Sequence, residues 1–284
     1  MMKSSTVRRF DRTAEGYLHW WAPVLAPMSG MLIDRLSTLE PSLASDPGSV
    51  ATARVVDVGC GTGNVVLAAA RGWPKALVTG IDASVGMLAV ADRERATLDQ
   101  SIADRVSLVA SDAAALPFPD GTFDVAMTAF VVQLVGDRPA VLREMRRVLR
   151  PGGLLGICGW LETGYVFAGD RELDAALADA SVEQPPVTEV RAGWYESPEQ
   201  AERELVASGF AAVDVLPATL NHAWTAQDYL AYRVTTRDVE LVDAMTPKEK
   251  RRFLASYEQR LAALSADELV FRAAVMSITA RAER

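Results

Sequence analysis

The chain has 284 residues, of which 50% are hydrophobic and 23% are charged. This composition predicts a folded protein with a sizeable core and excludes a largely disordered chain. The formal net charge of −8 argues against a nucleic-acid partner, because DNA and RNA binding normally requires a basic face.

Cysteine and histidine are scarce. The only members of these types are Cys60, Cys158, His19 and His222. We therefore expect free thiols in a reducing compartment, and no metal site. The start of the chain is polar, and no run of about 18 apolar residues occurs, so neither a secretory signal nor a membrane span is predicted. The expected location is the cytoplasm.

The N-terminal stretch has helical periodicity. Residues 7–33 place apolar side chains mostly three or four positions apart. Pro23 and Pro27 cannot both lie inside one helix without loss of backbone hydrogen bonds, so we expect two helices, the second beginning near Pro27. We assign residues 1–50 to an N-terminal helical cap or lid, which ends in a polar linker containing proline.

A glycine-rich turn follows the first predicted strand. Gly59, Gly61 and Gly63 come directly after the β-branched run 55–58, and a helical pattern starts at once. These glycines allow positive φ and let a ligand approach bare backbone beside a helix N-terminus, although a turn without a ligand fits the same pattern. Their spacing differs from the dinucleotide fingerprint, which argues against a nicotinamide cofactor. Asp57 is expected at the carboxyl end of its strand, where α/β sheets bind ligands.

Strand and helix patterns alternate from this turn onward. We expect strands over 54–58, 76–81, 105–109, 123–128, 152–159, 210–216 and 269–280, with helices over 63–72, 84–98 and 137–150. The alternation predicts an α/β fold with a Rossmann-like, doubly wound, mainly parallel seven-stranded sheet. We assign the core to 51–160, a substrate-side insertion to 161–196, and the C-terminal part of the sheet to 197–284. A helical lid is expected at 225–264, where a helical dimer contact is the alternative.

The string Asp57-Val58-Gly59-Cys60-Gly61-Thr62-Gly63 resembles motif I of the class I S-adenosylmethionine (SAM)-dependent methyltransferases. Four more matches follow in the family's order, at 81–82, 111–118, 127–133 and 147–155. The N-terminal Phe10-Asp11 with Tyr17 resembles the quinone-biosynthesis (methyltransferase type 11) branch, although Leu18 stands where an acidic residue is common. The resemblance implies SAM as cofactor, S-adenosylhomocysteine as product and methyl transfer to a small molecule.

The resemblance also implies a set of site residues. The expected cofactor-binding residues are Tyr17, Asp57, Gly59, Cys60, Gly61, Gly63, Asp82, Ala83, Met87, Asp112, Ala113, Ala129 and Phe130. Asp82 would accept bonds from the ribose hydroxyls, with helix capping as the alternative. Asp112 with the Ala113 N–H would meet adenine, or Asp112 would only form a turn. Met87 would pack on adenine or belong to the core.

The acceptor side is less defined by the sequence. The expected substrate-pocket residues are Trp20, Gln133, Trp160 and Tyr165. No catalytic residue is assigned, because an activated methyl group requires orientation more than covalent help. His19 is the candidate general base if one is used, with a packing or surface role as the alternative.

The sequence leaves several functional alternatives open. The methyl acceptor could be O, N or C, and the partner is expected to be a small molecule, with no nucleic acid. A SAM-binding regulatory protein without turnover is one alternative function, and a nicotinamide-dependent oxidoreductase is another. The chain is expected to be a monomer or a homodimer.

Overall fold

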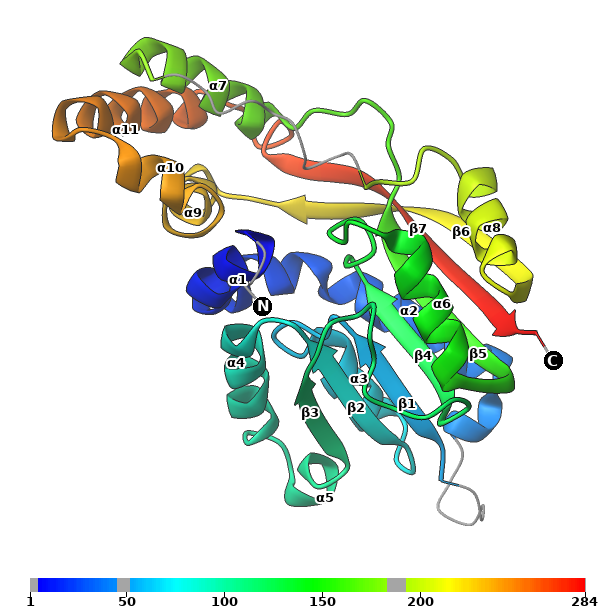
Figure 1. Cartoon of the computed structure of the whole chain (residues 1–284). Coiled ribbons are helices and arrows are strands. Elements are labelled where there is room, and N and C mark those ends of the chain that lie inside the picture. The colour runs from blue at the N-terminus through cyan, green and yellow to red at the C-terminus, as the bar shows by residue number, and fades with distance from the viewer. Residues whose placement is uncertain (1–4, 45–51, 183–192, 284) are drawn as a thin grey trace.

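The computed structural model describes residues 5–44, 52–182 and 193–283, and these contain one seven-stranded sheet of order β3-β2-β1-β4-β5-β7-β6 (Figure 1). The first five strands are parallel, and β7 is antiparallel to both of its neighbours. The predicted doubly wound α/β fold is confirmed. The strands are β1 Arg54–Val58, β2 Leu77–Asp82, β3 Val106–Ala110, β4 Phe123–Ala129, β5 Leu149–Trp160, β6 Phe210–Ala223 and β7 Val270–Ala282.

Helices cover both faces of the sheet. α2 and α3 pack on one face, and α6 and α8 pack on the other. The helices are α1 Ser5–Gly16, α2 Ala22–Leu39, α3 Asn64–Gly72, α4 Val85–Arg95, α5 Gln100–Ala103, α6 Arg138–Val148, α7 Ala168–Ala180, α8 Pro198–Ala207, α9 Ala226–Tyr232, α10 Val239–Ala244 and α11 Pro247–Ala262. Two segments, Tyr17–Trp21 and Arg233–Arg237, are π-helical, and Pro41–Leu43 is a 3₁₀ turn.

The N-terminal segment corrects the expectation of a second helix that begins near Pro27. α2 begins at Ala22, carries Pro23 in its first turn and contains Pro27 in its interior. In the π-helical turn before it, the Ala22 N–H donates to the carbonyl of Tyr17. Proline is tolerated in a first turn because its missing N–H is not needed there. Only Pro27 therefore removes a backbone bond from α2.

β6 is longer than the sequence predicts. β6 continues to Ala223, seven residues beyond the predicted 210–216, and stays paired with β7 up to Val270. It is an edge strand, which is where a sheet tolerates Pro217. Residues 225–264, where a helical lid is expected, contain three helices and a π-helical turn. Within the predicted insertion 161–196, residues 183–192 lie outside the described residues.

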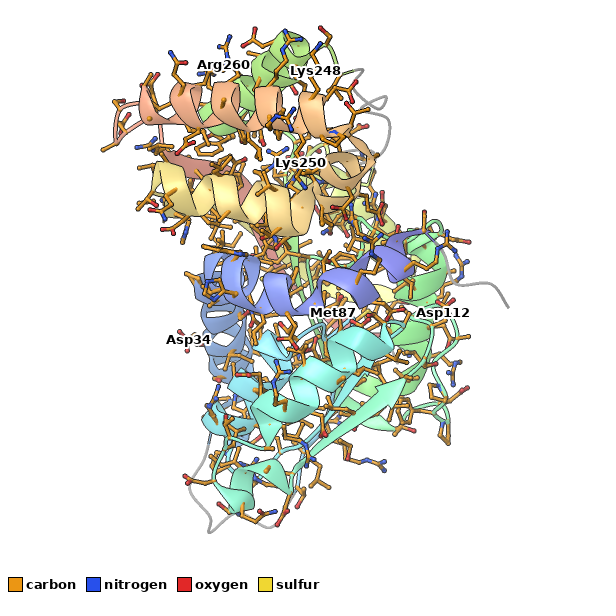
Figure 2. The ribbon with its side chains drawn as sticks, turned by 90° about the vertical axis from the view of Figure 1, so that its left-hand side faces the viewer. Asp34, Met87, Asp112, Lys248, Lys250 and Arg260 are labelled. Atoms are coloured by element: carbon orange, nitrogen blue, oxygen red, sulfur yellow. The ribbon has the colours of Figure 1, made fainter. Side chains whose placement is uncertain are left out.

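The segment between β6 and β7 forms a helical layer above the N-terminal cap (Figures 1 and 2). Trp21 of the cap stacks on Tyr232 of α9, with ring centroids 5.3 Å apart and planes within 3°. Gly16 lies so close to Thr236 that a Cβ on the glycine would overlap the threonine side chain. The cap and the helical layer therefore pack directly on one another.

A buried ionic cluster holds this layer together. Arg233 is only 4% exposed and pairs with Asp170 of α7 and with Asp238. The Tyr229 hydroxyl also donates to Asp170, at 2.7 Å. Burial opposes ionisation of Asp170, yet its pKa is lowered overall because Arg233 lies beside it. The cluster thus fixes the start of α7 against α9.

Candidate cofactor site

The glycine turn 59–63 lies between β1 and α3 at the carboxyl edge of the sheet. All three glycines have positive φ, with values of 76° at Gly59, 54° at Gly61 and 102° at Gly63. The N–H groups of Gly59 and Cys60 donate to the carbonyl of Ile81, at 2.7 and 2.8 Å, which ties the turn to β2. A Cβ on Gly59 would overlap Val131, whereas a Cβ on Gly61 would meet nothing within 4 Å. Open space therefore faces the turn at Gly61.

Asp57 lies beneath this turn as a buried carboxylate without a partner. It is 1% exposed, and neither of its carboxylate oxygens has a hydrogen-bond partner of good geometry among the described residues. Burial raises its pKa to about 7, although the nearby backbone N–H of Val66 opposes the shift. A cleft opens beside it, with walls from the N-terminal cap, the glycine turn and the end of β4. The lining residues are Tyr17, Leu25, Ser29, Asp57, Gly59, Cys60, Gly61, Thr62, Asn64, Val65, Ala129 and Phe130.

Asp82 ends β2 on the other side of the turn. One carboxylate oxygen accepts from the Gly61 N–H at 2.9 Å, and the other accepts from the Ser84 N–H at 2.8 Å. Ser84, rather than Asp82, is the N-cap of α4. Burial raises the pKa of Asp82, although these backbone donors oppose the shift. Each oxygen keeps a free lone pair, so Asp82 can still accept bonds from a ligand.

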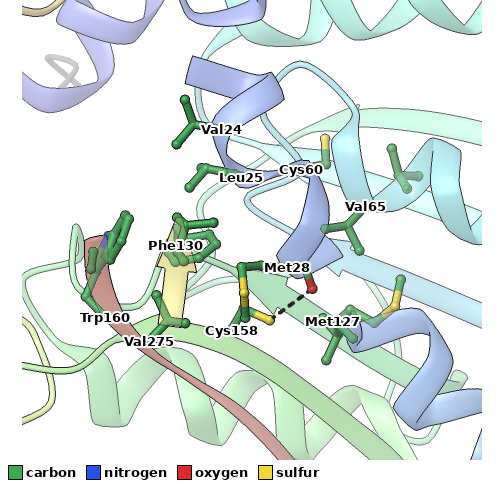
Figure 3. Packing of buried hydrophobic residues seen from close by; sticks show 14 of the residues in the cluster. Val24, Leu25, Met28, Cys60, Val65, Met127, Phe130, Cys158, Trp160 and Val275 are labelled. Carbon is green, nitrogen blue, oxygen red and sulfur yellow. Dashed lines mark hydrogen bonds between the residues drawn. The ribbon is translucent and has the colours of Figure 1, made fainter. Parts of the chain in front are cut away.

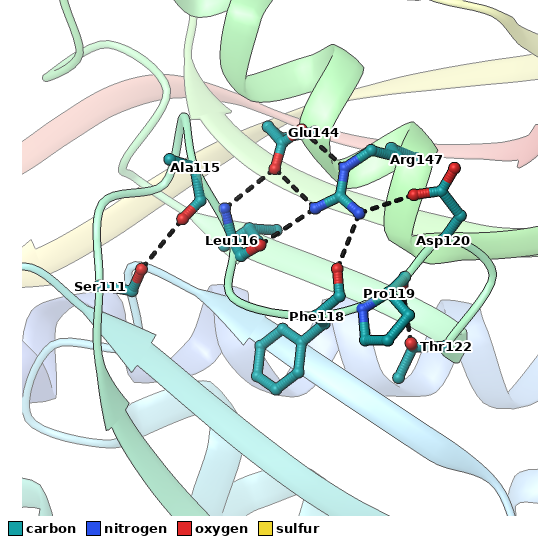
Figure 4. Close-up of polar contacts among 9 residues, drawn as sticks. All are labelled: Ser111, Ala115, Leu116, Phe118, Pro119, Asp120, Thr122, Glu144 and Arg147. Atoms are coloured by element: carbon teal, nitrogen blue, oxygen red, sulfur yellow. Dashed lines mark hydrogen bonds and ion pairs between the residues drawn. The ribbon is translucent and has the colours of Figure 1, made fainter.

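Asp112 is exposed and follows β3. Its Oδ1 accepts from the Ala114 N–H at 2.9 Å, which makes it a turn-forming residue in this structure, and Oδ2 is left for other contacts. The chain then runs into a loop held by α6 (Figure 4). Arg147 donates to the carbonyls of Leu116 and Phe118, at 3.0 and 2.7 Å, and Glu144 accepts from the Leu116 N–H at 2.9 Å.

The N-terminal cap is fastened over α4 by Asp11. Its Oδ1 accepts from the Ser84 hydroxyl at 2.8 Å and from the Gly86 N–H at 3.0 Å. A Cβ on Gly86 would lie 2.6 Å from the Asp11 carbonyl oxygen, so glycine permits the close approach. Met87, 2% exposed, packs in a small cluster with Ala14 of α1. The cap thereby covers the start of α4.

Comparison with known proteins agrees with this geometry. Residues 55–153 match the family described as methyltransferase domain. A demethylmenaquinone methyltransferase of Roseiflexus castenholzii is 36% identical over 150 residues, which cover 51% of this chain and 56% of that protein. A ubiquinone/menaquinone biosynthesis C-methyltransferase of Geobacter sulfurreducens is 43% identical over 101 residues, covering 35% of this chain and 39% of that protein. The chain thus spans 39–56% of the length of these relatives.

Residues 55–153 form a class I SAM-dependent methyltransferase domain. The predicted likeness to the quinone-biosynthesis type is confirmed for this domain. Solved structures share the fold over more of the chain. The YcgJ protein from Bacillus subtilis covers 89% of this chain and 99% of its own, with a TM-score of 0.57 and 18% identity. A Haemonchus contortus phosphoethanolamine N-methyltransferase, solved with S-adenosylhomocysteine, covers 88% of this chain and 52% of its own, with a TM-score of 0.50 and 19% identity.

The residues of the methyltransferase domain fit a cationic adenosyl cofactor. The carboxylates of Asp57 and Asp82 lie on either side of the glycine turn, and open space faces Gly61. A buried carboxylate without a partner is unfavourable until a cation reaches it. SAM carries a positively charged sulfonium and a positively charged ammonium group, so it supplies a cation that can pair with the Asp57 carboxylate.

The other predicted site residues differ in whether they line the cleft. Tyr17, Cys60, Ala129 and Phe130 line the cleft. The lining does not include the predicted residues Gly63, Asp82, Ala83, Met87, Asp112 and Ala113. Trp160 and Tyr165 belong to a group of aromatic rings around Phe271, described below. Trp20 packs edge-on against His19, with ring centroids 4.3 Å apart. His19 itself is exposed and does not line the cleft.

Five lining residues of the cleft were not among the predicted site residues, namely Leu25, Ser29, Thr62, Asn64 and Val65. Thr62 lies within the glycine turn, and Val65 lies in the first turn of α3. Leu25 and Ser29 lie on α2 with the helical spacing of buried residues, which gives no functional signal. Asn64 directly follows Gly63, and its side chain donates to the Ala22 carbonyl at 2.8 Å. The position of Asn64 next to the last glycine was the available signal.

Within the described ranges, no helix combines the length and apolar character needed to cross a bilayer.

Replacing Arg147 by Met is expected to weaken SAM binding. The change removes the donors that hold the loop after Asp112, so the KM for SAM should rise about 5- to 30-fold, as for about 1–2 kcal/mol of lost hydrogen bonding, while kcat changes little. Steady-state kinetics checks this. Arg150→Met is the control, because Arg150 pairs with Asp124 at the surface and holds no loop carbonyl in the described part of the chain. Equal effects of both variants would contradict the prediction.

Replacing Asp11 by Ala is expected to speed the release of SAM. The cap would lose its two bonds to α4, and the dissociation rate should rise about tenfold, as for about 1.4 kcal/mol. Stopped-flow displacement of bound SAM measures the rate. Glu15→Ala removes the exposed pair of Glu15 with Arg93, which joins the same two helices, and should change the rate by less than about threefold. An unchanged rate in Asp11→Ala would show that the cap is not a barrier.

Proposed function

We propose that this protein transfers the methyl group of SAM to a planar aromatic small molecule of the quinol class. The observation that carries the cofactor assignment is Asp57, which is buried, aimed at the cleft and unpaired. An acidic cleft attracts a cation and repels the pyrophosphate of a nicotinamide dinucleotide. The same observation therefore favours SAM over the oxidoreductase alternative.

Each part of the cofactor has a candidate group in the cleft or beside it. Asp57 would accept from the ammonium group, and the N–H groups of Asn64 and Val65 at the start of α3 would meet the carboxylate. Asp82 would accept bonds from the ribose hydroxyls while it holds Gly61. Asp112 would meet the adenine amino group through its second oxygen. Tyr17 would cover the bound cofactor from the cap.

A group of aromatic rings next to Phe130 would form the acceptor side. Trp160 stacks on Trp194, with centroids 5.4 Å apart, and lies 4.6 Å from Phe130 of the cleft wall. Phe271 of β7 lies 6.3 Å from Trp160 and 6.4 Å from Tyr165. Flat rings stack favourably on such surfaces. The relatives include a demethylmenaquinone methyltransferase, and this name supports an acceptor of the quinol class.

The chain offers no general base in the cleft among its described residues apart from Asp57, which the cofactor would occupy. His19 is exposed, and burial raises the pKa of the Tyr17 phenol, which makes it a poor base. When bound, SAM supplies an electrophilic methyl group. The protein would act by orientation, which can supply about 7–11 kcal/mol. An acceptor that is nucleophilic without enzymatic help is then required, and a reduced hydroquinone meets this condition better than the oxidised quinone.

The test is transfer of label from methyl-labelled SAM to a matched pair of acceptors, a reduced and an oxidised naphthoquinone. We expect label in the reduced compound and none in the oxidised one. Label only in N- or O-acceptors of a small-molecule extract would overturn the quinol assignment but keep the methyltransferase. SAM binding without transfer to any fraction would favour the regulatory alternative, and binding of NAD in preference to SAM would favour the oxidoreductase.

A further inference from the structure

Phe130 has an unusual backbone conformation at the point where β4 meets the cleft. Its φ is 58°, in the left-handed region, and its side chain is 6% exposed. This conformation costs a residue with a Cβ about 1–2 kcal/mol, so surrounding contacts must maintain it. Figure 3 shows Phe130 close to Trp160 and to Leu25 of α2.

Two hydrogen bonds hold the Phe130 backbone. Its N–H donates to the Cys158 carbonyl of β5, at 2.8 Å. Its carbonyl accepts from Nε2 of Gln133, three residues further along. This contact fixes the orientation of the carboxamide, because the reverse orientation would place two oxygens together. Oε1 of Gln133 is then buried with no hydrogen-bond partner among the described residues, and the donor end of the amide makes the contact with Phe130.

The turn 130–133 touches both sides of the proposed reaction centre. Val131 fills the space that the missing side chain of Gly59 leaves in the glycine turn. The Gln133 backbone lies against Gly193, where a Cβ would overlap it, and Trp194 next to it stacks on Trp160. A shift of the Phe130 backbone would therefore move the wall of the cofactor cleft and the acceptor side together.

We propose that Gln133 is a positioning residue that acts through Phe130, holding it in the left-handed conformation that aligns the cofactor cleft with the aromatic acceptor side. The role rests on the proposed methyl transfer, in which a misplacement of about 1 Å can reduce the rate about 100-fold. Gln133 was expected in the substrate pocket, and its side chain instead turns back onto the protein backbone.

Gln133→Met tests this role, because methionine has a similar length and lacks the donor. We expect kcat to fall about tenfold or more and the Kd of SAM to rise by a clearly smaller factor, since the cleft wall shifts while the carboxylates that would bind SAM remain. A second readout needs no activity. The backbone chemical shifts and HN–Hα coupling of Phe130 should leave the left-handed range in the ligand-free Gln133→Met protein.

A double-mutant cycle with Phe130→Gly decides whether Gln133 acts through Phe130. Glycine adopts positive φ without penalty, so Gln133→Met should have little further effect on kcat in the Phe130→Gly background. An equal loss in both backgrounds would overturn the proposal, and so would an unchanged Phe130 conformation in the single variant. If the wild-type protein transfers no methyl group, the proposed function fails, while the conformational readout still reports on Gln133.

Discussion

Replacing Asp57 by Asn is expected to reduce the affinity for SAM about 30- to 1,000-fold. The substitution keeps the shape of the side chain and removes the negative charge that a cationic cofactor would pair with. A buried charged pair or charge-assisted bond of this kind is worth about 2–4 kcal/mol. Isothermal calorimetry at about pH 8 measures the change. A loss smaller than about threefold would mean that Asp57 does not face the bound cation.

The same substitution should stabilise the protein when no cofactor is present. The folded-state pKa of Asp57, about 7, lies above its ordinary value of 3.8, so the fold favours the protonated form. Ionisation of Asp57 therefore lowers the free energy of unfolding progressively from about pH 4 to about pH 7, with no further loss above. The gain in Asp57→Asn should be larger at about pH 8 than at about pH 5, which denaturant unfolding can measure.

Replacing Gly61 by Ala is expected to abolish most SAM binding at a modest loss of stability. The new Cβ would enter the open space that faces the glycine turn, where the cofactor is proposed to lie. The φ of 54° adds about 1 kcal/mol of backbone strain. We expect the Kd for SAM to rise at least about 30-fold, measured by calorimetry. Unchanged affinity would place the cofactor elsewhere.

Gly152→Ala is the matched control. Gly152 also has a positive φ, of 76°, and a Cβ there would also meet nothing within 4 Å, but it lies in β5 away from the cleft. The two variants should lose similar amounts of stability in denaturant unfolding. Only Gly61→Ala should lose SAM affinity. A similar loss in both would mean that backbone strain alone, rather than contact with the cofactor, accounts for the effect.

The sheet could be predicted from sequence because its signals are local. The strand patterns at 54–58 and 123–128 and the glycines at 59–63 each report on their own backbone. The helix boundary predicted from Pro23 and Pro27 was wrong because Pro23 lies in the first turn of α2, where it removes no backbone hydrogen bond. The full length of β6 could not be predicted, because its last residues depend on pairing with β7, more than 40 positions away.

In the candidate site too, residues marked by a local pattern could be predicted from sequence, and residues placed by distant contacts could not. Asp57 and Asp82 were found because each lies at the carboxyl end of a strand, at a characteristic distance along the chain from the glycine turn. The fastening of Asp11 to Ser84 joins residues 73 positions apart, and no local pattern marks it. Gln133 was assigned to the substrate pocket because polar residues are scarce after β4. Its contact with the Phe130 carbonyl depends on a backbone conformation that sequence spacing does not reveal.

The most direct test of the acidic cleft as a SAM site is the affinity for SAM as a function of pH. Because a bound cation favours ionised Asp57, the wild-type protein should bind SAM more tightly as pH rises from about 6 to about 8 and release protons on binding below about pH 7. The amine of SAM titrates in part of this range, so Asp57→Asn serves as the reference. We predict a dependence in the wild type that the variant lacks. Identical pH profiles would contradict the account.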